Sequence, residues 1–357
     1  MAEFEIKELL HLMVEKQASD LHLGVDRRPT LRIDEKLFPV DWPVLQSNDV
    51  KNLIYSILTP EEINTFEQEK EMDKSFEIEK LSRYRINLFY QRGFVGAAIR
   101  AISLKIRSLS ECGLPERIVL NLCRRSRGLV LITGAAGSGK STTLASIIER
   151  INIESNCHIV TVEDPIEFIY ENKRAIIDQR EIGSDSHSFS TALKYVLRQD
   201  PDVILVGEMR DLETIEEALM IAETGHLVLA TLHTSETVQT INRIIDVFPS
   251  SQQQQVRTQL SFVLLGTISQ QLIPSFKKQG RVLASEIMVV NPAIRSLIRE
   301  QKVHQIFSVL QTSQHDSGMQ TMNQSLYHLY HTKKISFEEA IGRSTDTEEL
   351  LRLIKRY

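Results

Sequence analysis

Short apolar runs alternate with stretches of helical spacing through the middle of the chain. These runs are Leu129 to Thr133, His158 to Val162, Val203 to Val206 and Leu227 to Leu232. Strands that are apolar on both faces are typical of a mainly parallel sheet covered by helices on both sides. The pattern predicts an α/β domain over residues 116–290, with a linker at 106–115 that contains Gly113 and Pro115.

The two ends of the chain carry other patterns. Residues 1–105 begin with an amphipathic helical stretch around Leu9 and Met13, and then turn to segments in which apolar and polar residues alternate. The predicted strands there are Ser19 to Leu23, Thr30 to Asp34 and the strand-like segment from Arg83 to Ile102. We therefore expect an α+β domain over 1–105 and a helical region over 291–357.

The composition limits the classes of protein to which the chain can belong. The chain has 357 residues, 42% hydrophobic and 25% charged, which fits two or three globular domains. A formal net charge of -5 argues against a protein built mainly to bind nucleic acid. The three cysteines have no C-x-x-C spacing, which fits a reducing compartment. We find no signal peptide and no apolar run of membrane-spanning length, so membrane contact is expected only through partners.

The segment GAAGSGKS, Gly134 to Ser141, matches the phosphate-binding pattern G-x-x-x-x-G-K-[ST]. It directly follows a predicted strand and precedes a helical stretch, which is the context that this motif requires. Backbone amides in such a turn stabilise phosphate oxygens, Lys140 reaches the β and γ phosphates, and the Ser141 hydroxyl binds Mg²⁺. The alternative is a glycine-rich turn that binds nothing. The predicted nucleotide-binding residues are Gly134, Ala135, Ala136, Gly137, Ser138, Gly139, Lys140, Ser141 and Thr142, and the predicted cofactors are ATP and Mg²⁺.

Two predicted strands of the same domain end in carboxylates. Glu163 and Asp164 follow the strand at 158–162, and Glu208 lies two residues past the strand at 203–206. Ligands of open α/β sheets bind at the carboxyl ends of the strands, and hydrolysis needs groups that orient water and hold Mg²⁺. A surface cap or ion pair would explain either acid alone. The presence of both favours a catalytic role.

Histidines and arginines supply further candidates. His233 directly follows the strand at 227–232, on the edge expected for the phosphate loop, whereas His226 precedes that strand and lies near the far end. A neutral histidine can sense a γ-phosphate or relay a proton, but a purely structural role is equally compatible. The simpler interpretation of Arg83, Arg85, Arg92 and Arg100 is that they belong to a solvated face. The alternative is that they include an arginine finger, which reaches a nucleotide bound by another subunit.

These segments together resemble the secretion and type IV pilus ATPases. GAAGSGKSTTLASI resembles the Walker A motif of that family, IVTVEDPIEF its acidic box, LRQDPDVILVGEMRDLETIEEAL its Walker B segment and AETGHLVLATLHT its histidine box. All four occur in the family's order. AIRSLIRE, from Ala293, and the later GMQTMNQSL are similar to C-terminal segments of retraction motors of the PilT and PilU type.

The resemblance implies a RecA-like P-loop NTPase core, a PAS-like N-terminal α+β domain, a helical C-terminal region and assembly into a homohexamer. It also implies residue roles: Glu163 as general base or water-orienting acid, Glu208 as the Mg²⁺-associated Walker B acid, His226 and His233 as the histidine-box pair, and Arg85 and Arg100 as arginines that approach the nucleotide. Which of the two acids does which task stays open. Ala135 and Ala136 replace the usual Pro-Thr, which leaves the main-chain amides in place.

The function expected from this resemblance is an ATPase that powers pilus retraction. The expected setting is the cytoplasmic side of the inner membrane, where the motor would contact a pilus platform protein and a sister ATPase of the PilT or PilU type. Assembly and secretion ATPases are an alternative, but they usually carry an additional N-terminal domain and often a four-cysteine zinc element, neither of which we find in this sequence. A nucleic-acid translocase, an ATP-binding accessory subunit and a small-molecule kinase are alternatives from other classes.

Overall fold

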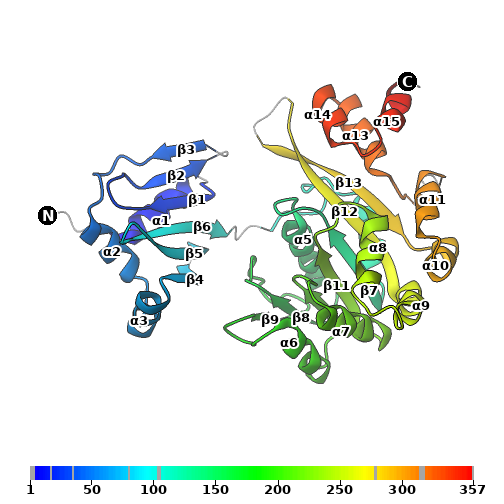
Figure 1. Cartoon of the computed structure of the whole chain (residues 1–357), viewed down its shortest axis with the longest axis horizontal. Helices are drawn as coiled ribbons and strands as arrows, with labels where there is room; N and C mark the ends of the chain where they lie inside the picture. Colours follow the sequence, from blue (N-terminus) through cyan, green and yellow to red (C-terminus); the bar gives the residue numbers. More distant parts are fainter. Residues whose placement is uncertain are drawn as a thin grey trace. The chain divides into compact units, whose positions relative to one another are not determined.

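The computed structural model describes residues 5–16, 18–33, 36–78, 81–102, 106–276, 280–312 and 318–355. The chain divides into two compact units, here called the N-terminal unit (Met1–Lys105) and the C-terminal unit (Ile106–Tyr357). Figure 1 shows the elements of each unit. Among the helices of the described residues, none has both the length and the apolar character needed to cross a bilayer.

The N-terminal unit is built on an antiparallel six-stranded sheet of order β3-β2-β1-β6-β5-β4. Its strands are β1 (Asp20–Leu23), β2 (Thr30–Ile33), β3 (Lys36–Pro39), β4 (Glu71–Ile78), β5 (Ser82–Gln91) and β6 (Phe94–Ile102), and its helices are α1 (Ile6–Glu15), α2 (Ser47–Tyr55) and α3 (Pro60–Glu69). The predicted strands appear as β1, β2 and the β5–β6 hairpin. Asp34, the last residue of one predicted strand, lies outside the described residues.

One face of this sheet is buried and the other is open to solvent. Along β5, Tyr84, Ile86 and Leu88 are fully buried in the core of the unit, whereas Arg85 and Asn87 between them are exposed. Successive side chains of a strand point to opposite faces, so the alternation in sequence becomes an apolar inner face and a polar outer face. The outer face carries Arg85 and Arg100, whereas Arg92 lies in the turn between β5 and β6.

The C-terminal unit contains a seven-stranded sheet of order β13-β12-β7-β11-β10-β8-β9. Its strands are β7 (Gly128–Thr133), β8 (His158–Glu163), β9 (Ile176–Glu181), β10 (Val203–Val206), β11 (Leu227–Leu232), β12 (Leu264–Pro274) and β13 (Arg281–Val289). All neighbouring strands are parallel except β13, which runs antiparallel to β12. The α/β class is confirmed, and the sheet is mixed because of this edge hairpin.

Helices cover both faces of this sheet (Figure 1). They are α4 (Glu116–Cys123), α5 (Lys140–Glu154), α6 (Phe189–Val196), η1 (Leu197–Gln199), α7 (Leu212–Glu223), α8 (Thr237–Asp246) and α9 (Gln253–Val263). Along β7, Leu129 and Leu131 join the core under α6 to α9, while Val130 and Ile132 join the core under α4 and α5. A strand buried on both faces has to be apolar throughout, which explains the continuous runs in the sequence.

The chain ends in helices, as expected. They are α10 (Pro292–Arg299), η2 (Val303–Gln305), α11 (Ile306–Thr312), α13 (Met322–His331), α14 (Phe337–Arg343) and α15 (Thr347–Lys355). The last three pack on the β12–β13 hairpin through a small core that includes Ile273, Ala284 and Leu326. Because β7, β8, β10 and β11 are parallel, the residues that follow them all emerge at one edge of the sheet, which we call the carboxyl edge.

Candidate active site

The phosphate loop connects β7 to α5 at the carboxyl edge. Gly134, Gly137 and Gly139 have φ values of 142°, 75° and 92°, a region that favours glycine. At Gly134 a Cβ atom would lie 2.5 Å from the backbone oxygen of Gln270 on β12, so the close approach of the two strands requires glycine there. The loop delivers its amides to the N-terminus of a 15-residue helix, where the helix dipole favours anions.

Lys140 is largely buried against this loop. Its Nζ donates hydrogen bonds to the carbonyl oxygens of Gly134 at 2.8 Å and Ala135 at 3.1 Å. Burial lowers the pKa of Lys140, and the negative charges of Glu208 and Glu167 oppose that shift. The partners of the ammonium are thus neutral oxygens, and among the described residues no carboxylate forms an ion pair with it.

Glu208 follows β10 and is tied to two basic side chains. Its Oε1 accepts a hydrogen bond from Arg210 Nε at 2.7 Å and lies 2.9 Å from His233 Nε2. Burial by itself would raise the pKa of Glu208, but the hydrogen bond from Arg210 and the nearby His233 outweigh it and leave the pKa lowered. The reciprocal hydrogen bond with Glu208 raises the pKa of Arg210, to which the charge of Asp164 adds. This cluster holds an ionised carboxylate at the carboxyl edge.

Glu163 ends β8 in a different environment. It is buried, accepts a hydrogen bond from the Thr161 hydroxyl at 2.7 Å and faces the Gln179 amide nitrogen at 3.4 Å. Burial raises the pKa of Glu163 to about 7, although these hydrogen bonds favour the ionised form. A carboxyl group with such a pKa can hold or release a proton near neutral pH.

The sheet order sets the spacing of these groups. Glu163 and Glu208 follow the adjacent strands β8 and β10, and β11 separates β10 from the strand that carries the phosphate loop. Glu208 and His233 are therefore nearer to Lys140 along the sheet than Glu163, which ends a strand three positions from β7. Both acids and His233 were predicted from the sequence, whereas Arg210, Thr161 and Gln179 were not. Arg210 lies in the same VGEMRD segment as Glu208. Gln179 lies on β9, a strand that the apolar pattern did not predict.

Three predicted residues have other contacts. His226 lies at the start of β11, at the opposite edge of the sheet, where its ring Nδ1 is 3.2 Å from the backbone oxygen of Ile221. Arg85 and Arg100 belong to the N-terminal unit, where they pair with Asp73 at 3.7 Å and Asp20 at 2.9 Å.

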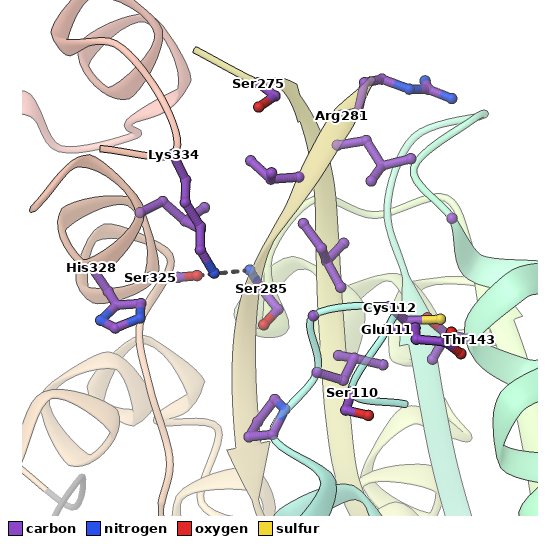
Figure 2. Close-up of a pocket in the computed structure, with 18 of the residues that line it drawn as sticks. Ser110, Glu111, Cys112, Thr143, Ser275, Arg281, Ser285, Ser325, His328 and Lys334 are labelled. Atoms are coloured by element: carbon purple, nitrogen blue, oxygen red, sulfur yellow. Dashed lines mark hydrogen bonds between the residues drawn. The ribbon is translucent and has the colours of Figure 1, made fainter. Parts of the chain in front are cut away.

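A cavity of about 830 Å³ adjoins the N-terminal end of α5. Gly139, Thr142 and Thr143 line it from the phosphate loop and α5, and further residues come from the segment 107–115, the β12–β13 hairpin and α13. Figure 2 shows Glu111, Thr143, Arg281 and His328 around it. Its volume lies within the range of small-molecule sites. The cavity is continuous with the phosphate loop and was not predicted, because its residues are scattered over more than 200 positions of the sequence.

A phosphate loop at the edge of an α/β sheet, with acids at the ends of neighbouring strands, defines the class of P-loop nucleotide-binding proteins. More narrowly, the chain belongs to the Type II/IV secretion system protein family, whose model matches residues 2–342. This confirms the resemblance inferred from the four motifs.

Proteins named as type IV pilus ATPases match over nearly the whole chain. The chain is 46% identical over 336 residues to the type IV pilus retraction ATPase PilT of Pseudomonas aeruginosa, covering 94% of this chain and 97% of that protein. It is 38% identical over 351 residues to the type IV pilus ATPase PilU of the same organism, with 98% and 91% covered. A crystal structure of the pilus retraction motor PilT with bound ADP matches with a TM-score of 0.92 and 47% identity, over 98% of this chain and 100% of that one.

Proposed function

We propose that this chain is an ATP-hydrolysing motor that powers the retraction of type IV pili, working as a homohexamer. The observation that carries the proposal is the extent of the similarity: the match to a retraction ATPase covers 94% of the chain, both units included, and does not stop at the phosphate loop. A match to the type II secretion protein HxcR of P. aeruginosa covers only 57% of the chain, at 33% identity. The alternative of an assembly or secretion ATPase is therefore not favoured.

The phosphate loop is proposed to bind the triphosphate of ATP, with the nucleoside in the adjoining cavity. Residues 134–142 would supply main-chain amides, and Lys140 would exchange its two carbonyl partners for phosphate oxygens. The Ser141 hydroxyl and the ionised Glu208 carboxylate are hard oxygen ligands, the type that Mg²⁺ prefers. The ion, when bound, would neutralise charge on the phosphates.

Glu163 is proposed as the general base. Its carboxylate takes a proton from water while the water oxygen bonds to the γ-phosphorus, and the bond to the bridging oxygen of ADP breaks, releasing ADP and phosphate. A pKa of about 7 keeps a useful fraction of the group ionised at neutral pH and makes it a competent proton acceptor. His233 would hold Glu208 in place. Arg85, Arg100 and His226 are proposed to act between neighbouring subunits.

Force has to reach the pilus through other proteins. We expect the ring to work in the cytoplasm against a platform protein of the inner membrane, with a sister ATPase of the PilT or PilU type as a second partner. The PAS-like character of the N-terminal unit is part of the same proposal. A nucleic-acid translocase is a weaker candidate, because the net charge of the chain is -5.

The test uses purified full-length protein. The wild type should form six-subunit rings and hydrolyse ATP with Mg²⁺, and Lys140→Ala should lower kcat by about 10²-fold or more through loss of phosphate stabilisation. Lys173→Ala, on an exposed loop of the same unit, is the matched control and should retain the wild-type rate. In cells, deletion of the gene should leave surface pili but abolish twitching. Wild-type turnover in Lys140→Ala, or cells without pili after the deletion, would contradict the proposal.

A further inference from the structure

A row of charged side chains crosses the open face of the N-terminal sheet. The strand register places Arg32 of β2 opposite Asp20 of β1, Asp20 opposite Arg100 of β6, and Arg100 opposite Arg85 of β5. Directly paired residues on neighbouring strands share one face and lie about 5 Å apart. Asp20 is therefore the single acid between two arginines in a row of four charged groups.

Asp20 is the best anchored member of this row. Its carboxylate is 13% exposed, accepts a hydrogen bond from the Ser19 hydroxyl at 2.8 Å, and lies 3.8 Å from Arg32 Nε. Arg100 Nε donates to it at 2.9 Å. The side chain of Arg100 is nevertheless 69% exposed. Asp20 thus fixes one end of a guanidinium whose other end reaches solvent.

The geometry of that contact leaves the two terminal NH₂ groups of Arg100 available. No other side chain or carbonyl among the described residues pairs with them. Arginine carries five donors in a planar fork, and a contact through Nε leaves the outer pair free for a bidentate contact with phosphate. Asp20 therefore holds the guanidinium group without occupying its terminal NH₂ groups.

A second arginine lies beside Arg100 on this face. Arg85 faces it directly across the strands, and like charges in that relation are destabilising. The carboxylate that Arg85 meets is Asp73 at 3.7 Å, with both side chains about half exposed, so it compensates weakly. Burial lowers the pKa of His22 on the same face; the charge of Asp20 opposes that shift, and the charges of Arg32, Arg27 and Arg100 add to it. Both arginines keep much of their side chains exposed, 69% for Arg100 and 44% for Arg85.

We infer that Asp20 is a positioning residue for the reaction: by holding Arg100 through Nε, it presents the free NH₂ groups of that arginine to the phosphates of a nucleotide bound by another subunit. The inference rests on the proposed function, in which Arg100 acts between subunits. It gives a role to the SDLHL segment, which the sequence marks only as a strand. Asp20 itself touches no phosphate.

The test is a double-mutant cycle on full-length rings with kcat, KM for ATP and ring size as readouts. Arg100→Ala should lower kcat by about 10³-fold, the lower range for an arginine finger. Asp20→Asn should lower kcat by about 10- to 100-fold through misplacement of that group, with KM and ring size unchanged. In the Arg100→Ala background, Asp20→Asn should have no further effect, because its only action on the rate passes through Arg100. Arg32→Gln, which removes the other arginine beside Asp20, is the control and should retain the wild-type kcat.

The outcomes distinguish the intersubunit role of Arg100 from the positioning role of Asp20. A wild-type kcat in Arg100→Ala overturns the intersubunit role of Arg100 and the inference with it. A reduced kcat in Arg100→Ala together with a wild-type kcat in Asp20→Asn overturns the inference alone. An additive loss in the double variant, or an equal loss in Arg32→Gln, also overturns it, since either would mean that Asp20 acts on the unit as a whole. Should Asp20→Asn fail to fold, Asp20→Glu keeps the charge but shifts the carboxylate, and the same non-additive loss is expected from it.

Discussion

The ends of β8 and β10 place two glutamates side by side at one sheet edge, yet in opposite electrostatic settings. At the end of β8, burial raises the pKa of Glu163 to about 7, and its neighbours Thr161 and Gln179 are neutral. At the end of β10, burial opposes ionisation of Glu208, but Arg210 and His233 keep its pKa lowered. The same residue type thus has its pKa raised to about 7 in one place and lowered in the other.

We propose that this difference separates the two roles that the sequence left open. A general base must change its protonation state near the working pH, whereas an acid associated with Mg²⁺ must stay ionised. The environments of the two acids, and not their positions after a strand, make that distinction. We therefore propose Glu163 as the base and Glu208 as the acid associated with the metal ion.

The largest effect is expected from Glu163→Gln, which keeps the shape of the side chain and removes its proton chemistry. We expect kcat to fall by about 10³-fold while nucleotide binding is retained, because general base catalysis contributes about 10²- to 10⁴-fold. Steady-state turnover and binding of a fluorescent ATP analogue would measure both. Glu171→Gln, an exposed acid of the following segment, should behave as the wild type. A Glu163→Gln enzyme that turns over normally would reverse the assignment.

Glu208→Gln should weaken the binding of Mg²⁺ instead of removing the general base. The concentration of Mg²⁺ needed for half-maximal turnover should rise by about 10- to 100-fold, as it does when groups that support a metal site are removed. Part of the lost rate should return at high Mg²⁺, whereas the rate of Glu163→Gln should not. A Mg²⁺ titration of both variants checks this. An unchanged Mg²⁺ dependence in Glu208→Gln would remove the acid from the metal site.

The raised pKa of Glu163 also predicts a stability difference. The folded state prefers the protonated acid, so its contribution is fully present below the ordinary value of 4.5 and is lost as pH rises through about 7. Above pH 7 the buried charge should cost on the order of 3 kcal/mol, because burial raises the pKa from 4.5 to about 7 and a tenfold change in an equilibrium is worth about 1.4 kcal/mol. Glu163→Gln should therefore melt at a higher temperature than the wild type at pH 8 and at the same temperature at pH 4. Equal melting temperatures at pH 8 would argue against the raised pKa.

The smallest effect is expected from Arg210→Gln. Arg210 is exposed, and its removal should let the pKa of Glu208 move upward without displacing the carboxylate, which His233 still contacts. We expect turnover to be nearly normal at pH 8 and to fall more steeply than that of the wild type as the pH is lowered. Arg198→Gln on the same unit is a control for loss of a surface charge. Identical pH profiles for the two variants would show that Arg210 does not tune Glu208.

The sequence predicts the centre of this molecule better than its edges. Strands buried on both faces, such as β7 and β10, must be apolar throughout, so the sequence shows them as continuous apolar runs. Strand β12 was not predicted because Thr267, Ser269 and Gln270 interrupt its apolar pattern. These side chains are buried and form hydrogen bonds with Thr237, Thr133 and Thr143, and among the buried side-chain atoms of the described residues of this strand only Oε1 of Gln270 lacks a partner. Such partners are up to 136 positions away, so no local pattern reveals them.

The candidate site follows the same rule. The loop at 134–141 and the acids after two strands were predicted because each depends on local sequence order. The pKa of Glu163 depends on burial under elements distant in sequence, and the contact of Glu208 with His233 depends on the parallel order of β10 and β11. Three-dimensional packing, and not residue identity, decides how each acid behaves.

Single-turnover hydrolysis of ATP by wild-type rings, followed from about pH 5.5 to about pH 9, tests the assignment of Glu163 most directly. We predict a rate that rises with pH and levels off with an apparent pKa near 7, and no such limb in the residual rate of Glu163→Gln. A rate that stays constant as intact rings pass from pH 8 to pH 6, or the same limb in Glu163→Gln, would contradict it.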